Sequence, residues 1–121
     1  MKIILTTTSP DIDSAVDPRC GRGAYLTVVD GDTLDWKAYP NPGVGATGGA
    51  GVQAAQFAAA QKASAVISGD FGPNAFDTLQ AVGIAMYLYP PGATTARSVV
   101  EQFKAQTLKP AGAATRPGHH G

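Results

Sequence analysis

The sequence predicts a single α/β domain in which helices flank a mixed five-stranded sheet. Three observations favour this fold class. Short runs rich in β-branched and aromatic residues recur along the chain, a Gly-Asp turn joins two of them into a hairpin, and helix-forming segments separate the later ones. The predicted order is β-β-β-α-β-α-β-α. An antiparallel hairpin followed by strands that alternate with helices requires a sheet with both strand directions.

The predicted strands are short and are bounded by glycine or proline. Gly31-Asp32 supplies the hairpin turn between the second and third strands. Pro40 and Pro42 end the third strand, because proline has no backbone amide to donate to a ladder. The strands are expected at residues 2–8, 24–30, 33–39, 65–69 and 84–89.

The helices are predicted from their start and stop signals. Pro73 favours a helix start, Gly83 ends that helix, and Thr94 or Thr95 caps the last one, which turns Val99, Val100 and Phe103 inward. The helices are expected at residues 52–62, at 75–82, and from the threonine cap to about residue 106. Residues 1–108 then form the domain, residues 9–23 a long loop within it, and residues 109–121 a flexible C-terminal tail rich in proline, glycine and alanine.

The composition excludes several classes of protein. Apolar residues make up 44% of the chain and charged residues 15%, so the chain is globular rather than disordered. Nine basic and nine acidic residues cancel, which leaves no basic field for a nucleic acid. No apolar run approaches the roughly 20 residues that cross a bilayer, and the N-terminal run is too short for a signal peptide. A single cysteine excludes an internal disulfide. We expect a soluble, cytoplasmic protein without nucleic-acid or membrane partners.

A glycine-rich turn precedes the first helix. Residues 43–51 read GVGATGGAG, and the helix-forming run VQAAQFAAA follows. The N-terminus of a helix leaves backbone amides unpaired and carries partial positive charge, so it attracts anions. Gly48, Gly49 and Gly51 carry no side chain that would keep a ligand from the backbone. The alternative is that these glycines only make a tight, crowded turn.

The same turn also resembles a dinucleotide-binding fingerprint. Gly43-Val-Gly45-Ala-Thr-Gly48 has the spacing G-x-G-x-x-G, and Asp70 follows at about the distance of a ribose-binding acid. Against this interpretation, Pro40 and Pro42 separate the turn from its strand, and that strand belongs to a hairpin. A nucleotide-binding enzyme or regulator therefore stays as the alternative function. No lysine follows the glycines as a phosphate-binding P-loop requires.

Three stretches together resemble a known family, over roughly residues 1–108. They are Arg19-Cys20-Gly21-Arg22, then Asn41-Pro42 ahead of Gly48-Gly49-Ala50-Gly51-Val52-Gln53-Ala54-Ala55, and finally Ser68-Gly69-Asp70-Phe71-Gly72-Pro73-Asn74-Ala75-Phe76. In this order they resemble the dinitrogenase iron–molybdenum cofactor biosynthesis family, and within it the orange protein branch. The resemblance implies a ribonuclease-H-like fold and a protein that binds or carries metal–sulfur clusters. For the orange protein branch, it implies a molybdenum–copper sulfide cluster held without covalent attachment; another iron– or molybdenum–sulfur precursor is the alternative cargo.

The resemblance also implies where an anionic cluster would bind. Two helix starts would supply backbone amides, Arg19 and Arg22 would supply positive charge, and Phe71 would form an apolar wall. Cys20 would be a soft ligand for copper(I), with an inert thiol as the alternative. The cluster-binding residues are expected to be Arg19, Arg22, Gly48, Gly49, Ala50, Gly51, Val52, Phe71, Gly72, Asn74 and Ala75. His119 and His120 are further candidate metal ligands, or equally a solvated tail.

The sequence does not favour an enzyme. Nuclease chemistry on a ribonuclease-H-like fold needs several carboxylates around two metal ions, one of them in the first strand, and residues 2–8 contain no acid. Asp70 stands alone at a strand end, and both histidines lie in the tail, which excludes a Ser-His-Asp triad. We therefore expect no enzymatic activity. A cluster-binding protein with partners for delivery or regulation is expected, and a protein–protein adaptor is a further alternative.

Overall fold

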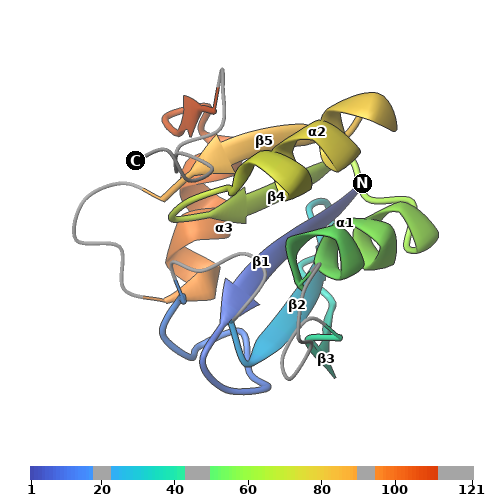
Figure 1. Ribbon diagram of the computed structural model, residues 1–121. Coiled ribbons are helices and arrows are strands. Elements are labelled where there is room, and N and C mark those ends of the chain that lie inside the picture. The colour runs from blue at the N-terminus through green and yellow to red at the C-terminus, as the bar shows by residue number, and fades with distance from the viewer. Residues whose placement is uncertain (18–22, 43–49, 90–94, 112–121) are drawn as a thin grey trace.

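The computed structural model describes residues 1–17, 23–42, 50–89 and 95–111, and within them it shows one mixed sheet with helices on both faces (Figure 1). The elements, in chain order, are β1 (Lys2–Thr7), β2 (Tyr25–Asp30), β3 (Trp36–Pro40), α1 (Ala50–Ala60), β4 (Ala65–Ser68), α2 (Pro73–Ala81), β5 (Ala85–Leu88), α3 (Ala96–Lys104) and β6 (Lys109–Pro110). Each predicted helix and strand is present with somewhat different ends. Thr95 caps α3, as one of the two predicted threonines.

The sheet is mixed, as predicted, but it has six strands in the order β3-β2-β1-β4-β5-β6. β1 pairs antiparallel with β2 and parallel with β4, and β4 pairs parallel with β5. The prediction of five strands was wrong. The sixth, β6, lies in the segment assigned to the flexible tail, where Pro110 pairs with Tyr87 and Lys109 with Leu88. A two-residue strand containing proline has no periodicity that a sequence pattern can detect. Residues 112–121 of the predicted tail lie outside the described residues.

Both edges of the sheet carry a proline that faces outward. The amide of Asn41 donates to the carbonyl of Ala24 (3.1 Å), so alternation along β3 turns Pro40 away from β2. The amide of Ala111 donates to the carbonyl of Met86 (3.0 Å), which likewise turns Pro110 away from β5. Because an outward position needs no amide donor, proline fits there, and it blunts the edge against pairing with another chain.

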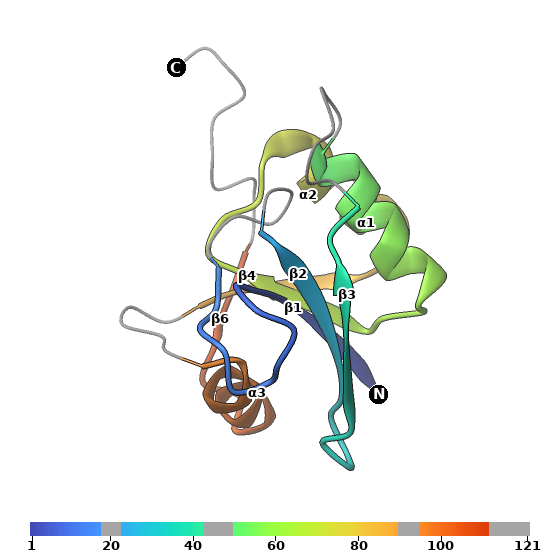
Figure 2. The ribbon, with the colours of Figure 1, turned by 90° about the horizontal axis from the view of Figure 1, so that it is seen from below.

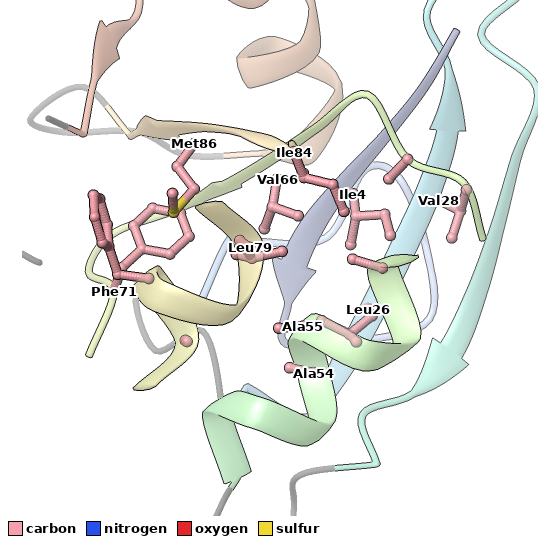
Figure 3. Packing of buried hydrophobic residues seen from close by; sticks show 14 residues of the cluster. Ile4, Leu26, Val28, Ala54, Ala55, Val66, Phe71, Leu79, Ile84 and Met86 are labelled. Carbon is pink, nitrogen blue, oxygen red and sulfur yellow. The ribbon is translucent and has the colours of Figure 1, made fainter. Parts of the chain in front are cut away.

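Helices cover the two faces of the sheet unequally. Figure 2 shows α1 and α2 on one face and α3 on the other. Successive residues of β1 alternate between these faces: Ile4 packs toward α1 and α2, whereas Ile3 and Leu5 pack toward α3. The side chains under α1 and α2 form the first core cluster (Figure 3), which contains Ile4, Leu26, Val28, Ala54, Ala55, Ala58, Ala63, Val66, Phe71, Ala75, Phe76, Leu79, Ile84 and Met86. The second core cluster contains Ile3, Leu5, Ile12, Val29, Ile67, Ala96, Val99, Val100 and Leu108.

The loop that follows β1 packs firmly on α3. Ile12 is fully buried in the second core cluster. The carbonyls of Ser14 and Ile12 accept the first amides of α3, from Ala96 (3.1 Å) and Arg97 (2.9 Å). The Arg97 guanidinium also donates to Asp13 (2.7 Å), and this hydrogen bond lowers the pKa of the Asp13 carboxyl below its ordinary value. The N-terminus of α3 is therefore occupied by the protein itself.

Replacing Thr95 with alanine should lower the free energy of unfolding by about 1 kcal/mol, the usual effect of losing a helix N-cap. The Thr95 hydroxyl accepts the amide of Ser98 (3.2 Å), and alanine leaves that amide without its acceptor. Urea unfolding measures the loss.

Thr78→Ala is the matched control, because the Thr78 hydroxyl only donates back to the carbonyl of Asn74 within α2 (2.8 Å). Alanine is the better helix former at such a position, so we expect little loss or a slight gain in stability. Equal losses in the two variants would contradict the capping role of Thr95.

Candidate functional site

The candidate site lies at one edge of the sheet. β1, β4 and β5 are parallel, and β3 runs in the same direction because it is antiparallel to β2, which is antiparallel to β1. The carboxyl ends of these strands meet at a single edge, which we call the carboxyl edge, and α1, α2 and α3 begin there (Figure 1). In open α/β sheets, ligands bind at this edge, where the direction of chain connection reverses.

The first turns of α1 and α2 touch each other at the carboxyl edge. A Cβ built on Gly51 would stand 2.9 Å from the Cβ and 3.5 Å from the amide nitrogen of Ala75. A larger side chain at position 51 would push the two helices apart, so glycine is required by the close approach. The structure thus brings together Gly51 and Ala75, from two sequence stretches that were expected to form one site; their part in binding stays a prediction.

The chain enters β2 and leaves β3 at the carboxyl edge. The amide of Asp17 donates to the carbonyl of Thr6 (2.8 Å), at the end of β1, and the amide of Asn41 donates to Ala24 (3.1 Å). Asp17 and Asn41 are both buried. The flanks of the two predicted binding loops therefore lie at one edge. The loop residues themselves, Arg19, Cys20, Arg22, Gly48 and Gly49, lie outside the described residues, as do His119 and His120.

The start of α2 differs from that of α3. Gly72 is the N-cap of α2, in an extended conformation (φ −66°, ψ 165°), and as a glycine it brings no side chain to cap the helix. Pro73 occupies the first turn, where the backbone amide of a helix has no partner within the helix, so the missing N–H of proline costs no hydrogen bond. Asn74, the next residue, is exposed. There is open space beside this N-cap, since among the described residues nothing lies within 4 Å of a Cβ built on Gly72, and a helix N-terminus of this kind favours anions. On α1, Val52 is half-buried one residue beyond Gly51, and Ala50 is the first helical residue.

Phe71 does not occupy the position that the sequence suggested. It was expected to form an apolar wall of the site, but its side chain is fully buried. It packs in the first core cluster with Leu79 and Met86 (Figure 3). The strand that supplies Met86 arrives later in the chain, which is why burial of Phe71 was not evident from the sequence. The ring therefore packs in the core beneath α2 and is not exposed at the surface.

Sequence reasoning missed a group of hydroxyls at the carboxyl edge. The Thr6 hydroxyl lies 3.3 Å from that of Ser68 and 3.1 Å from that of Tyr89. Thr6 and Ser68 are fully buried, at the ends of β1 and β4. One sequence signal could have indicated this group: β1 and β4 are apolar strands that end in hydroxyl residues. Buried hydroxyls need hydrogen-bond partners that the strand ladder does not supply, so they tend to pair with one another.

Comparisons with known proteins identify the family of the chain. The family model described as dinitrogenase iron-molybdenum cofactor matches residues 1–106. The chain belongs to this family. The resemblance that three sequence stretches suggested is therefore confirmed. No curated protein matches the chain.

Solved structures of the same fold come from several organisms. The apo form of the orange protein from Desulfovibrio gigas is 34% identical over 95% of this chain and 96% of its own, with a TM-score of 0.89. A Thermotoga protein named as a NifB protein of the DUF35 family is 23% identical over 95% of this chain and 97% of its own, with a TM-score of 0.81. A Methanocaldococcus jannaschii protein named as a dinitrogenase is 12% identical over 93% and 96%, with a TM-score of 0.68. The last two show a shared fold alone.

Two observations concern metals and membranes. Within the described ranges, no three His, Cys, Asp or Glu side chains gather where they could hold a metal ion. Across the same part of the chain, no helix combines the length and the apolar character needed to span a bilayer. The ribonuclease-H-like classification and the cytoplasmic location stay predictions.

Replacing Gly51 with alanine should destabilise the domain, although alanine is the better helix former by about 1 kcal/mol. The added methyl group would stand 2.9 Å from the Cβ of Ala75, so the first turns of α1 and α2 would have to separate. Overpacking of this kind costs about 1–3 kcal/mol and outweighs the gain in propensity. Urea unfolding measures the net effect.

Gly72→Ala serves as the control for this substitution. Nothing lies within 4 Å of a Cβ at Gly72, and its φ of −66° suits any residue, so we expect unchanged or slightly higher stability. The close contact between the helices would be refuted if Gly51→Ala were as stable as Gly72→Ala.

Proposed function

We propose that this protein holds or carries an anionic metal–sulfide cluster of the molybdenum–copper type, bound without covalent attachment at the carboxyl edge. Membership of the dinitrogenase iron–molybdenum cofactor family supports a metal–sulfur cargo. The 34% identity to the orange protein supports that branch as a model for the kind of cluster. The single observation that carries the proposal is the contact between the first turns of α1 and α2.

The physical argument concerns charge. A thiomolybdate and its copper adducts are anions with sulfur on the outside, so they need donors and positive potential more than a full set of protein ligands. Two adjoining helix starts add their partial positive charges, and the glycine N-cap of α2 has open space beside it. The N-terminus of α3 offers no comparable site, because the loop after β1 already accepts its amides.

The three sequence-predicted side chains complete the proposed site. Arg19 and Arg22 would attract the anion and bind its outer sulfurs, and Cys20 would be available to copper(I) as a soft ligand. These roles rest on the sequence, whereas the placement of their flank, Asp17 at the end of β1, rests on the structure. We propose a binding role rather than a catalytic one, since the hydroxyls nearest this edge are engaged with one another.

Reconstitution tests the function directly. The purified apo-protein is mixed anaerobically with tetrathiomolybdate and copper(I) and passed through a gel-filtration column. We expect the chromophore to elute with the protein in a 1:1 complex. Elution of all colour at the small-molecule position would rule the proposal out. Calorimetry with adenine nucleotides then separates the cluster carrier from the nucleotide-binding alternative, for which binding heat is required.

Asn74→Asp should weaken cluster retention while stabilising the fold. An added carboxylate in the first turn of α2 favours the helix by about 0.3–1 kcal/mol, but it repels an anion bound at the same place. We expect the cluster to dissociate several-fold faster, measured as loss of visible absorbance from the reconstituted protein after transfer to buffer.

Gln80→Glu provides the matched control for Asn74→Asp. It adds the same charge at an exposed position in the last turn of α2, away from the carboxyl edge. The cluster should dissociate from it at the wild-type rate. Equal acceleration in both variants would show that net charge, and not the start of α2, governs retention.

A further inference from the structure

The parallel register of β1 and β4 stops short of the carboxyl edge. The last paired residues are Leu5 and Ile67, and Thr6 and Ser68 lie one position beyond them. Beyond the last pair, Tyr89 connects the two strands. Tyr89 directly follows β5, and β4 lies between β5 and β1 in the sheet.

Tyr89 joins the ends of both strands. Its hydroxyl donates to the carbonyl of Thr6 (2.8 Å) and accepts from the amide of the same residue (3.1 Å). Its own amide donates to the carbonyl of Ser68 (2.9 Å). One residue thus holds β1 through its side chain and β4 through its main chain, and we call these hydrogen bonds the Tyr89 brace.

The brace acts on the two segments that leave these strands. Thr6 accepts the amide of Asp17 (2.8 Å), and its hydroxyl donates to the carbonyl of Asp17. Asp17 lies two residues before Arg19 in the sequence, and Ser68 directly precedes the loop that leads to Gly72 and the start of α2. The separation between the loop after β1 and the start of α2 therefore depends on where Tyr89 holds Thr6 relative to Ser68.

We propose that Tyr89 is a positioning residue for the cargo site, which sets the spacing between the loop after β1 and the start of α2. This inference rests on the proposed function and adds a residue that belongs to neither α1 nor α2. The phenol ring packs against the second core cluster, so Tyr89→Phe keeps the packing and removes only the hydroxyl. Without that hydroxyl, Thr6 loses its hydrogen bonds to Tyr89, and the carboxyl ends of β1 and β4 depend on the weaker 3.3 Å contact between the hydroxyls of Thr6 and Ser68.

Thr27→Val is the matched control. The Thr27 hydroxyl is buried and lies 2.9 Å from that of Thr7, and Thr27 pairs with Leu5 on the face of the second core cluster. Both variants therefore remove one hydroxyl that lies next to a threonine of β1. Only Tyr89→Phe breaks the brace, so comparison of the two separates positioning from a general loss of stability.

The test uses the protein reconstituted with tetrathiomolybdate and copper(I). We expect Tyr89→Phe to lose colour about five- to tenfold faster than Thr27→Val, as loss of an ordering hydrogen bond predicts, and its visible absorption band to shift. Amide hydrogen exchange of the apo-protein should accelerate at Asp17 in Tyr89→Phe and stay at the wild-type rate in Thr27→Val. Equal rates of colour loss and an unshifted band in the two variants would overturn the positioning role.

The exchange measurement also distinguishes this inference from the proposed function. If the wild-type protein retains no colour, the proposed function fails, and exchange at Asp17 decides the brace without any cluster. Faster exchange in Tyr89→Phe then supports the brace, and unchanged exchange refutes it. If the wild-type protein retains colour and Tyr89→Phe behaves like Thr27→Val, the inference fails and the proposed function stands.

Discussion

The close approach of α1 to α2 is the constraint on which the candidate site depends. Only glycine fits at position 51, because a Cβ there would stand 2.9 Å from the Cβ of Ala75. That contact places two helix starts side by side over the ends of parallel strands. On the buried face of α1, small residues such as Ala54, Ala55 and Ala58 let the helix lie close to the sheet and keep its start at the carboxyl edge. A bulkier core would lift α1 away and separate the two sets of backbone donors.

The three helix starts at the carboxyl edge have different fates. The first amides of α3 are taken by carbonyls of Ile12 and Ser14 and by the hydroxyl of Thr95, so that terminus is used for stability. The N-cap of α2 is a glycine, which brings no capping side chain of its own, and α1 begins next to it. Satisfying a helix terminus internally stabilises the fold, whereas leaving one accessible keeps it available for an anion. The proposed binding of an anionic cluster at this edge depends on this difference between the helix starts.

The sequence was informative where the chemistry is local. The glycine-rich run before Gly51, the Gly72-Pro73 pair and the threonine cap each signal a helix start within a few residues, and all three helices were predicted. Features that depend on distant parts of the chain were not predicted. Burial of Phe71 depends on Met86 of β5, β6 is too short to show a period, and Tyr89 reaches Thr6 across an intervening strand. The sequence supplied candidate residues for the site, but it did not supply the contacts that hold the described ones in place.

The central claim is that an anion binds where α1 and α2 begin. Amide chemical-shift mapping of the ¹⁵N-labelled apo-protein during titration with tetrathiomolybdate tests it most directly. The account predicts saturable shifts concentrated at Gly51, Val52, Asn74 and Ala75, with the amide of Arg97 at the start of α3 unmoved. Shifts centred on α3, or no saturable shift at either α1 or α2, would contradict it.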